Sequence, residues 1–107
     1  MNKGDLVLIP FPFTDLTGSK NRPPLVLASG KLDVTVSFIS TQLKWKEKTD
    51  LSIAPNNKNG LKKESLIRLS KLATIDKDLV LGRLGRIDES IRISVNVNLK
   101  RIFGLDG

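Results

Sequence analysis

The chain opens with a run of apolar residues that predicts a buried strand. Residues 4–13 read GDLVLIPFPF, with four consecutive aliphatic side chains before the first proline. Such continuous runs are typical of strands that are covered on both faces. Because Pro10 and Pro12 have no amide donor, the second half of this strand is predicted to lie at a sheet edge or to carry a bulge.

Short apolar segments separated by polar turns make up the middle of the chain. Further strands are expected over residues 25–28, 32–40, 50–55, 65–75 and 79–87, the last either as a strand or as a short helix followed by one. The alternation of apolar and polar side chains in 32–40 breaks at Ile39 and Ser40, where we expect a bulge. Residues 14–22 and 56–60 are polar and contain Gly and Asn, which favours a loop and a tight turn. This pattern is typical of a small β-barrel or sandwich.

The last stretch of the chain fits two different elements. At strand spacing, apolar side chains recur at Ile91, Ile93, Val95, Val97 and Leu99. At helix spacing, one apolar face contains Ile91, Val95, Leu99 and Ile102. Asp88 is a suitable start for a helix and Gly104 a suitable stop, whereas the β-branched content favours a strand. The pattern alone leaves both elements open.

Length and composition indicate one ordinary globular domain, residues 1–107. Hydrophobic residues make up 39% and charged residues 27% of the chain. No apolar run approaches the length needed to cross a bilayer, and the N-terminus lacks the apolar core of a secretory signal. We therefore expect no membrane partner and a cytoplasmic location.

The chain contains neither cysteine nor histidine. Without cysteine there is no disulfide, no thiolate nucleophile and no Cys-based zinc site. Without histidine the commonest general base and the commonest transition-metal ligand are missing, although a carboxylate-bound magnesium site stays open. An enzyme built from this chain must work with carboxylates, hydroxyls, Lys and Arg.

The charge balance is strongly basic. Eighteen Lys and Arg residues against eleven Asp and Glu residues give a formal net charge of +7 and a sequence pI near 10.0. Such an excess on a small domain attracts polyanions. Nucleic acid is the first candidate and an acidic protein the alternative, while basic residues that only keep the chain soluble fit the composition equally well.

Several short motifs follow one another along the first half of the chain. They are Gly4-Asp5-Leu6-Val7, Gly18-Ser19, Arg22-Pro23 followed by Leu25-Val26-Leu27, and Ile39-Ser40-Thr41-Gln42. A less specific match continues from Gly60-Leu61 to Leu72. In this order and spacing, in a basic chain of this length without histidine, the motifs resemble the MazF/PemK toxin family. The resemblance covers nearly the whole chain.

The resemblance implies a mainly β fold with short helices (α+β), a small SH3-like β-barrel of the MazF/PemK/CcdB type. A C-terminal helix over residues 88–104 is implied as well. Such toxins of type II toxin–antitoxin systems form two-fold homodimers and cut single-stranded RNA, in particular mRNA, at short sequences without a metal or cofactor. Their partner is an antitoxin, with which they bind DNA, and its acidic, disordered C-terminal tail lies along the RNA groove.

Arg22, Ser40 and Thr41 are the candidate catalytic residues. The planar guanidinium of Arg22 can hold two non-bridging phosphate oxygens, and Arg22 matches the family's catalytic arginine in its Arg-Pro motif. Ser40 aligns with a catalytic hydroxyl that is more usually threonine, and the adjacent Thr41 can share or take this role. Asp15 or Glu47 can act as general base if the fold brings either near Arg22.

Structural roles are the alternative for the same residues. An exposed loop arginine is often merely solvated, and hydroxyls at a strand end often satisfy backbone groups. Pro24 departs from the family, which usually has a small apolar residue there, and removes an amide at the start of the strand beside Arg22.

Residues around the single tryptophan are the candidate RNA-binding residues. The set comprises Lys20, Gln42, Lys44, Trp45 and Lys46. The lysines can neutralise phosphates, Gln42 can read a base edge, and the indole can stack on a base. Alternatively, Trp45 packs into a dimer interface or covers one end of the barrel.

Two other functions remain open on the same barrel. One is a CcdB-like toxin that poisons gyrase by binding protein, and the other is an RNA-binding barrel without catalysis. Arg22 with Ser40 and Thr41 favours the ribonuclease, because a protein-binding toxin has no need of a phosphate clamp paired with hydroxyls.

Overall fold

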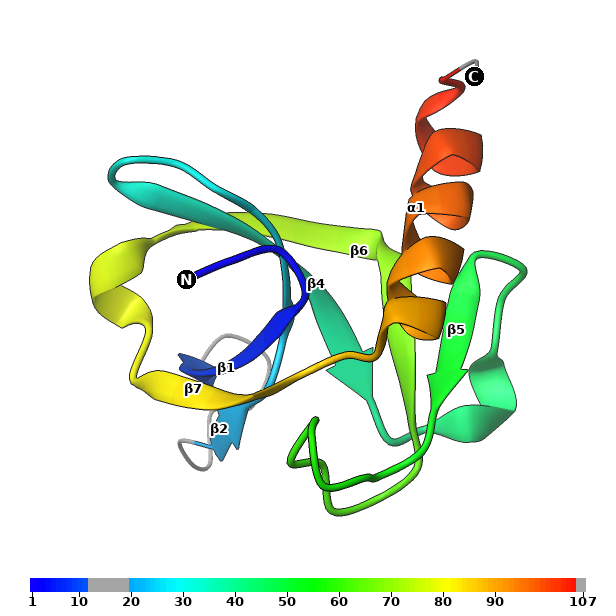
Figure 1. Ribbon diagram of the computed structural model, residues 1–107, viewed down its shortest axis with the longest axis horizontal. Coiled ribbons are helices and arrows are strands. Elements are labelled where there is room, and N and C mark those ends of the chain that lie inside the picture. Colours follow the sequence, from blue (N-terminus) through cyan, green and yellow to red (C-terminus); the bar gives the residue numbers. More distant parts are fainter. Residues whose placement is uncertain (12–19, 106–107) are drawn as a thin grey trace.

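The computed structural model describes residues 1–11 and 20–105, and for Phe11, Lys20 and Asn21 it describes the backbone only. Within these residues the chain forms seven strands, two short 3-10 helices and one α-helix (Figure 1). In chain order the elements are β1 (Asp5–Phe11), β2 (Lys20–Arg22), β3 (Leu25–Ser29), β4 (Asp33–Ser40), η1 (Leu43–Trp45), β5 (Asp50–Ile53), β6 (Ser65–Asp76), η2 (Lys77–Leu79), β7 (Gly82–Arg86) and α1 (Glu89–Phe103).

The strands form one antiparallel sheet in the order β2-β1-β3-β4-β6-β5, and β7 pairs with β1 beside this path. Among the described residues β5 and β7 do not pair, so the curled sheet is an open barrel. The helix α1 packs against β5 and β6 (Figure 1). The expected mainly β fold with a C-terminal helix is therefore confirmed.

The first strand behaves as Pro10 predicts, whereas Pro12 lies outside the described residues. Its first half pairs with β7 and, at Leu6, with β3, whereas its second half pairs with β2 from Ile9 to Phe11. Pro10 thus lies where the described sheet has one neighbour. Residues 20–22 were expected in a loop and instead form β2, because a short antiparallel pairing takes its donors from alternate residues and one proline does not prevent it.

The irregularity expected at Ile39 and Ser40 lies elsewhere. Both residues pair regularly with β6, and the register shifts between Ser37 and Phe38. Ser37 lies opposite Leu72 and Phe38 opposite Arg68, so the extra residues belong to β6. The buried positions of β4 change phase here, from Val34 and Val36 to Ser37 and Ile39, just before the alternation in the sequence breaks.

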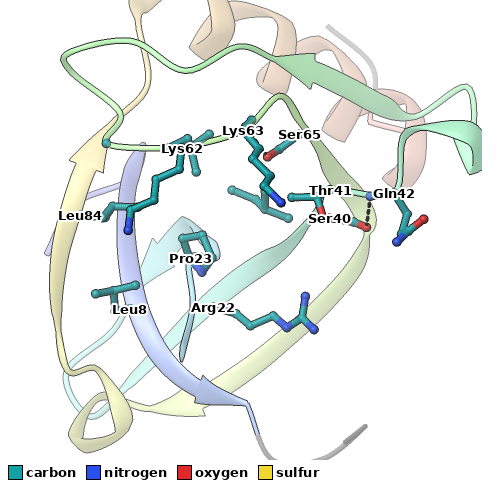
Figure 2. A pocket seen from close by; sticks show the side chains of 13 residues that line it. Leu8, Arg22, Pro23, Ser40, Thr41, Gln42, Lys62, Lys63, Ser65 and Leu84 are labelled. Carbon is teal, nitrogen blue, oxygen red and sulfur yellow. Dashed lines mark hydrogen bonds between the residues drawn. The ribbon is translucent and has the colours of Figure 1, made fainter. Parts of the chain in front are cut away.

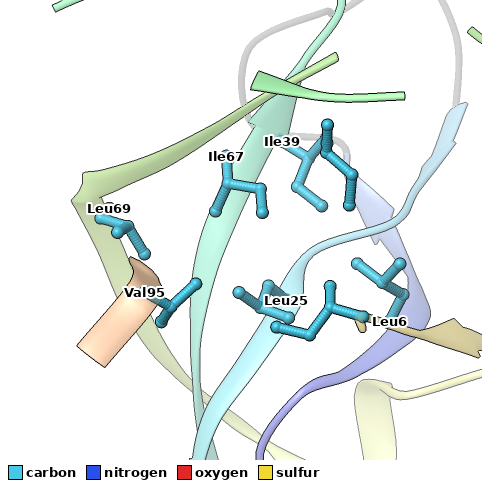
Figure 3. Close-up of a cluster of buried hydrophobic side chains, with 8 residues drawn as sticks. Leu6, Leu25, Ile39, Ile67, Leu69 and Val95 are labelled. Atoms are coloured by element: carbon cyan, nitrogen blue, oxygen red, sulfur yellow. The ribbon is translucent and has the colours of Figure 1, made fainter. Parts of the chain in front are cut away.

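Two apolar clusters lie on the two faces of the strands. One contains Leu6, Leu25, Ile39, Ile67, Leu69 and Val95 together with Ile53 and Ile87, and Figure 3 shows Val95 reaching it from α1. The other contains Val7, Ile9, Val26, Val34 and Val36. Adjacent residues such as Leu6 and Val7 enter different clusters, so β1 is buried on both faces, as its continuous apolar run predicts.

The C-terminal stretch is the helix α1, in agreement with the resemblance. Val95 is 1% exposed, whereas Ile93 and Val97, which only the strand spacing would bury, are 56% and 43% exposed. Asp88 precedes the first turn, and Gly104 ends the helix in the left-handed conformation with φ of 64°. In the described part of the chain, no helix combines the length and the apolar character that crossing a bilayer requires.

Candidate active site

A groove of about 640 Å³ brings together the strongest candidates from the sequence (Figure 2). Arg22, Ser40, Thr41 and Gln42 all line it. The remaining lining residues are Leu8, Pro23, Ile39, Gly60, Leu61, Lys62, Lys63, Ser65 and Leu84. Segments far apart in the sequence therefore meet here: the end of β2, the end of β4, and the loop that leads into β6.

Arg22 is held at the last position of β2. Its backbone lies opposite Ile9 of β1, and Pro23 directly after it fixes the direction of the chain. Pro24 is buried, and its carbonyl oxygen accepts a hydrogen bond from the amide of Val7 at 3.2 Å. Proline at position 24, where the family usually has a small apolar residue, thus fits the strand junction, because Pro24 takes part through its carbonyl oxygen as an acceptor. Figure 2 shows the exposed Arg22 side chain extending towards Ser40 and Gln42.

Ser40 ends β4 on a tight side-chain turn. Its Oγ accepts a hydrogen bond from the amide of Gln42 at 3.0 Å, marked by the dashed line in Figure 2. A hydroxyl that accepts in this way keeps its proton for donation to another group. Ser40 is half-buried and Thr41 is exposed, so the Ser40 hydroxyl is the more firmly oriented of the two.

The opposite wall of the groove is formed by Lys62, Lys63 and Ser65, none of which was predicted from the sequence. Figure 2 shows both lysines reaching into the groove from the loop before β6. The sequence offered one signal for these residues. Two adjacent cations lie just after the strong turn 56–60, and a tight turn fixes where the following residues point.

That turn is rigidly built. Asn59 is fully buried, accepts from the amide of Leu61 at 2.9 Å and donates to the carbonyl oxygen of Ala54 at 2.9 Å. Gly60 has φ of 70°, which favours glycine, and a Cβ there would lie 2.6 Å from the carbonyl oxygen of Leu84. The turn therefore fixes the wall formed by Lys62 and Lys63, which we call the lysine wall, to β7.

The groove combines cations with apolar surface. Leu8, Leu61, Leu84 and the ring of Pro23 line it alongside the guanidinium, the lysines and the hydroxyls. Cations and hydroxyl donors suit phosphate oxygens, and apolar side chains suit the faces of bases and sugars. The arrangement can hold a nucleotide chain with charge stabilisation at a phosphate.

Of the other expected RNA-binding residues, Lys44, Trp45 and Lys46 are not among the described residues that line this groove. Lys44 and Trp45 lie in η1 just after Gln42, and Trp45 is 67% exposed, so within this chain it does not pack into the core. The Lys46 Nζ donates to the Ser52 Oγ at 3.0 Å. Lys20 lies in β2 opposite Phe11, and its side chain is outside the described part.

Glu47 does not reach the groove. Its Oε1 lies 2.7 Å from Nη2 of Arg68, and Nε of Arg68 lies 3.3 Å from the buried Asp50 carboxylate. The amide of Glu47 also donates to Asp50 at 2.9 Å, so this network ties the segment after η1 to β5 and β6. Asp15, the other candidate base, lies outside the described residues.

The described lining residues include no carboxylate. Over the described part of the chain, no group of three His, Cys, Asp or Glu side chains is placed to hold a metal ion. The chemistry available from these residues is charge stabilisation by Arg and Lys and hydrogen bonding by hydroxyls and an amide.

The fold is similar to that of solved mycobacterial toxins and ribonucleases. The Mycobacterium tuberculosis toxin MazF-mt6 has a TM-score of 0.78 and 20% identity, over 96% of this chain and 99% of that chain. An endoribonuclease from a mycobacterial species, solved in complex with its cognate antitoxin, has a TM-score of 0.77 and 17% identity, over 100% of this chain and 98% of that chain. At these identities the likeness concerns the fold.

A match at the level of sequence comes from a family model. No curated protein matches the chain. The model of PemK-like, MazF-like toxins of type II toxin–antitoxin systems matches residues 2–103. Since this match spans nearly the whole sequence and the fold agrees with it, the chain belongs to the PemK-like, MazF-like toxins of type II toxin–antitoxin systems.

Proposed function

We propose that this toxin is a sequence-specific endoribonuclease that cuts single-stranded RNA, in particular mRNA, without a metal or cofactor. The observation that carries the proposal is the single groove lined by Arg22, Ser40 and Gln42 on one side and two lysines on the other. Solved relatives named as endoribonucleases share the fold. A CcdB-like protein-binding toxin would not need a guanidinium and hydroxyls lining one groove.

The proposed reaction uses the nucleophile that RNA itself carries. The ribose 2′-hydroxyl loses its proton and attacks the adjacent phosphorus, and the bond to the 5′-oxygen of the next nucleotide breaks. The leaving oxygen takes up a proton. The products are a 2′,3′-cyclic phosphate and a 5′-hydroxyl end.

Arg22 is the proposed phosphate clamp. As the 2′-oxygen attacks, negative charge grows on the two non-bridging oxygens, and a planar guanidinium can donate to both at once. Stabilisation that is stronger in the transition state than in the bound substrate accelerates the reaction. Lys63, whose side chain enters the same groove, adds positive charge from the opposite wall.

Ser40 is the proposed hydroxyl donor, with Thr41 as the alternative. The bond from the Gln42 amide fixes the Ser40 Oγ and leaves its proton for a phosphate oxygen. For the general base, Asp15 remains our candidate, since Glu47 is engaged by Arg68. Positioning of the 2′-hydroxyl against the phosphate contributes to the rate independently of any base.

Replacing Ser40 and Thr41 tests which of the two hydroxyls is the donor. We expect Ser40→Ala to lower the single-turnover cleavage rate about 100-fold, because one oriented donor to the developing charge is lost. Ser40→Thr keeps the hydroxyl and is expected to retain most activity, and Thr41→Ala is expected to have the smaller effect. Rates measured at saturating protein decide this, and a larger loss in Thr41→Ala would exchange the two roles.

The lysine wall is proposed to bind substrate phosphates, together with Lys20, Lys44 and Lys46. Gln42 would then read a base edge and Trp45 would stack on a base. The proposed partners are single-stranded RNA, a second copy of the chain and an acidic antitoxin with a disordered C-terminal tail, with which the toxin would bind DNA. A cytoplasmic location and inhibition of growth follow from cleavage of mRNA.

Removing both lysines is expected to weaken binding in a salt-dependent way. For Lys62→Ala/Lys63→Ala, the slope of log affinity against log salt should fall by about 1.4, since each phosphate contact on a single strand contributes about 0.7. Fluorescence anisotropy with an RNA carrying a 2′-deoxy nucleotide at the cleavage position measures this. Lys31→Ala/Lys71→Ala removes the same charge from exposed positions elsewhere and should keep the slope.

The proposed function is tested directly with a long single-stranded RNA in EDTA. We expect discrete cuts at one recurring short sequence, with cyclic phosphate and 5′-hydroxyl ends. RNA that stays intact but bound would favour the non-catalytic barrel. RNA that is neither cut nor bound by folded protein would favour a protein-binding toxin.

A further inference from the structure

A second basic hollow adjoins the candidate groove. It has a volume of about 460 Å³ and is lined by Lys58, Arg83, Leu84, Gly85 and Arg86, which we call the β7 hollow. Three of these five residues are cations and none is acidic. Leu84 also lines the candidate groove, so the two depressions share one apolar side chain as their common edge.

The hollow and the groove are parts of one rigid construction. The amide of Arg86 donates to the carbonyl oxygen of Lys58 at 2.9 Å, which docks the turn 56–60 onto β7. A Cβ at Gly85 would lie 2.2 Å from that same oxygen, so only glycine permits the approach. Because the turn 56–60 is anchored to β7, Lys58 within it and Lys62 just after it are held in fixed positions.

The cations of the hollow retain donors for a ligand. Nε of Arg83 lies 3.4 Å from the Asp5 carboxylate and Nζ of Lys58 lies 3.7 Å from Asp88, with the basic side chains 55% and 63% exposed. The pair of Lys58 with Asp88 is weak because both side chains are partly exposed, and Arg83 uses one of the five donors of its guanidinium on the buried Asp5. Within the described part of the chain, Arg86 is exposed and makes no ion pair with a carboxylate.

The acidic residues that pair with these cations line a neighbouring depression and not the β7 hollow itself. Lys58, Arg83 and Arg86 also line this neighbouring depression, in which Asp5, Asp88 and Glu89 lie together with Lys3 and Arg92. On the side of Leu84, where the hollow adjoins the groove, the described lining residues of the two contain cations but no acid. This cationic lining without acids favours a chain of phosphates that continues from the groove into the hollow.

We propose that the β7 hollow is a subsite for the phosphates of nucleotides that flank the cleavage site. The inference rests on the proposed ribonuclease function and extends it from the cleaved nucleotides to their neighbours. Arg86 and Lys58 bind backbone phosphates, and Leu84 contacts the sugar or base between the two sites. The subsite lengthens the RNA segment that the toxin binds without adding base-specific contacts.

The test variant is Lys58→Gln/Arg86→Gln, which leaves the pair between Arg83 and the buried Asp5 in place. Its matched control is Lys31→Gln/Lys71→Gln, which removes the same charge from exposed residues outside both depressions. Equal thermal midpoints of the two variants and the parent protein exclude a folding effect. The probes are RNAs with a 2′-deoxy nucleotide at the cleavage position, one short and two extended by several nucleotides at the 5′ or the 3′ end.

We expect extension at one end to tighten binding to the parent protein and the control. In the test variant about tenfold of this gain should be lost, with unchanged affinity for the short RNA. The end that shows the effect gives the direction of the strand. Affinity that falls equally for short and long RNA, or for neither, overturns the subsite.

Two further results separate the possible failures. If the parent protein cuts RNA while the variant keeps the full gain from extension, the subsite is wrong and the proposed function stands. If the parent neither cuts nor binds any of the RNAs, both fall. Loss of binding to a Glu-rich peptide with an unaltered RNA length dependence assigns the hollow to an acidic protein and likewise overturns the proposal.

Discussion

Arg22→Ala is expected to lower the rate of RNA cleavage about 1,000-fold while the protein stays folded. A single donor aimed at charge that develops in the transition state contributes about 100- to 1,000-fold, and a guanidinium that serves both non-bridging oxygens belongs at the upper end. Arg22 is exposed at the end of β2, where truncation should change the free energy of unfolding by less than about 0.5 kcal/mol. Single-turnover cleavage of a defined RNA in EDTA measures the effect.

Two matched variants make this result interpretable. Arg22→Lys keeps the charge but loses the planar fork, so we expect intermediate activity. Arg101→Ala removes an exposed arginine from the last turn of α1, outside the groove, and should cleave like the parent protein. Cleavage by Arg22→Ala at the parent rate would remove the phosphate clamp from the mechanism, and loss of RNA affinity with an unchanged rate at saturation would make Arg22 a binding residue only.

Gly85→Ala is expected to lower the free energy of unfolding by about 3 kcal/mol, or the melting temperature by about 15 °C. The new Cβ would lie 2.2 Å from the Lys58 carbonyl oxygen and 2.6 Å from the carbonyl carbon of Asn59. These are backbone atoms, so the whole turn must move away from β7. The bond from the Arg86 amide to Lys58 would then be lost or stretched. Chemical denaturation measures the free energy and calorimetry the melting temperature.

Gly82→Ala is the control on the same strand. A Cβ there meets no atom of the described residues within 4 Å and φ is not positive, so the change should stay within about 0.5 kcal/mol of the parent protein. Equal stability of the two variants would show that the turn adjusts without cost. Because Lys62 and Lys63 lie just after the same turn, Gly85→Ala should also weaken RNA binding before it unfolds the protein.

Much of the fold could be predicted from local patterns. The continuous apolar run of β1, the strands from β3 to β7, the turn 56–60 and the edge position of Pro10 follow from side-chain periodicity and from the missing proline amide. These features depend on which residues can be buried and which backbone groups can pair. Both properties can be read from a single segment.

The candidate site was predictable only in part. The family motifs identified Arg22, Ser40, Thr41 and Gln42, which line one groove. Lys62, Lys63 and the β7 hollow were not found, because no local pattern distinguishes a lysine in a groove from a solvated one. Glu47 was a reasonable base by residue type, but its contact with Arg68 is made by a distant strand.

By itself, the sequence determined that this protein is basic and mainly β, and its motifs indicated the toxin family and Arg22 and Ser40 as candidate site residues. Tertiary structure decided the rest. Residues 91–102 carry strand and helix periods together, and the helix forms because its face with Val95 closes an apolar cluster beside β5 and β6. The register shift in β6 and the groove were decided in the same way. Both depend on contacts between segments that are distant in sequence, and the pattern of one segment does not show which distant segment it will contact.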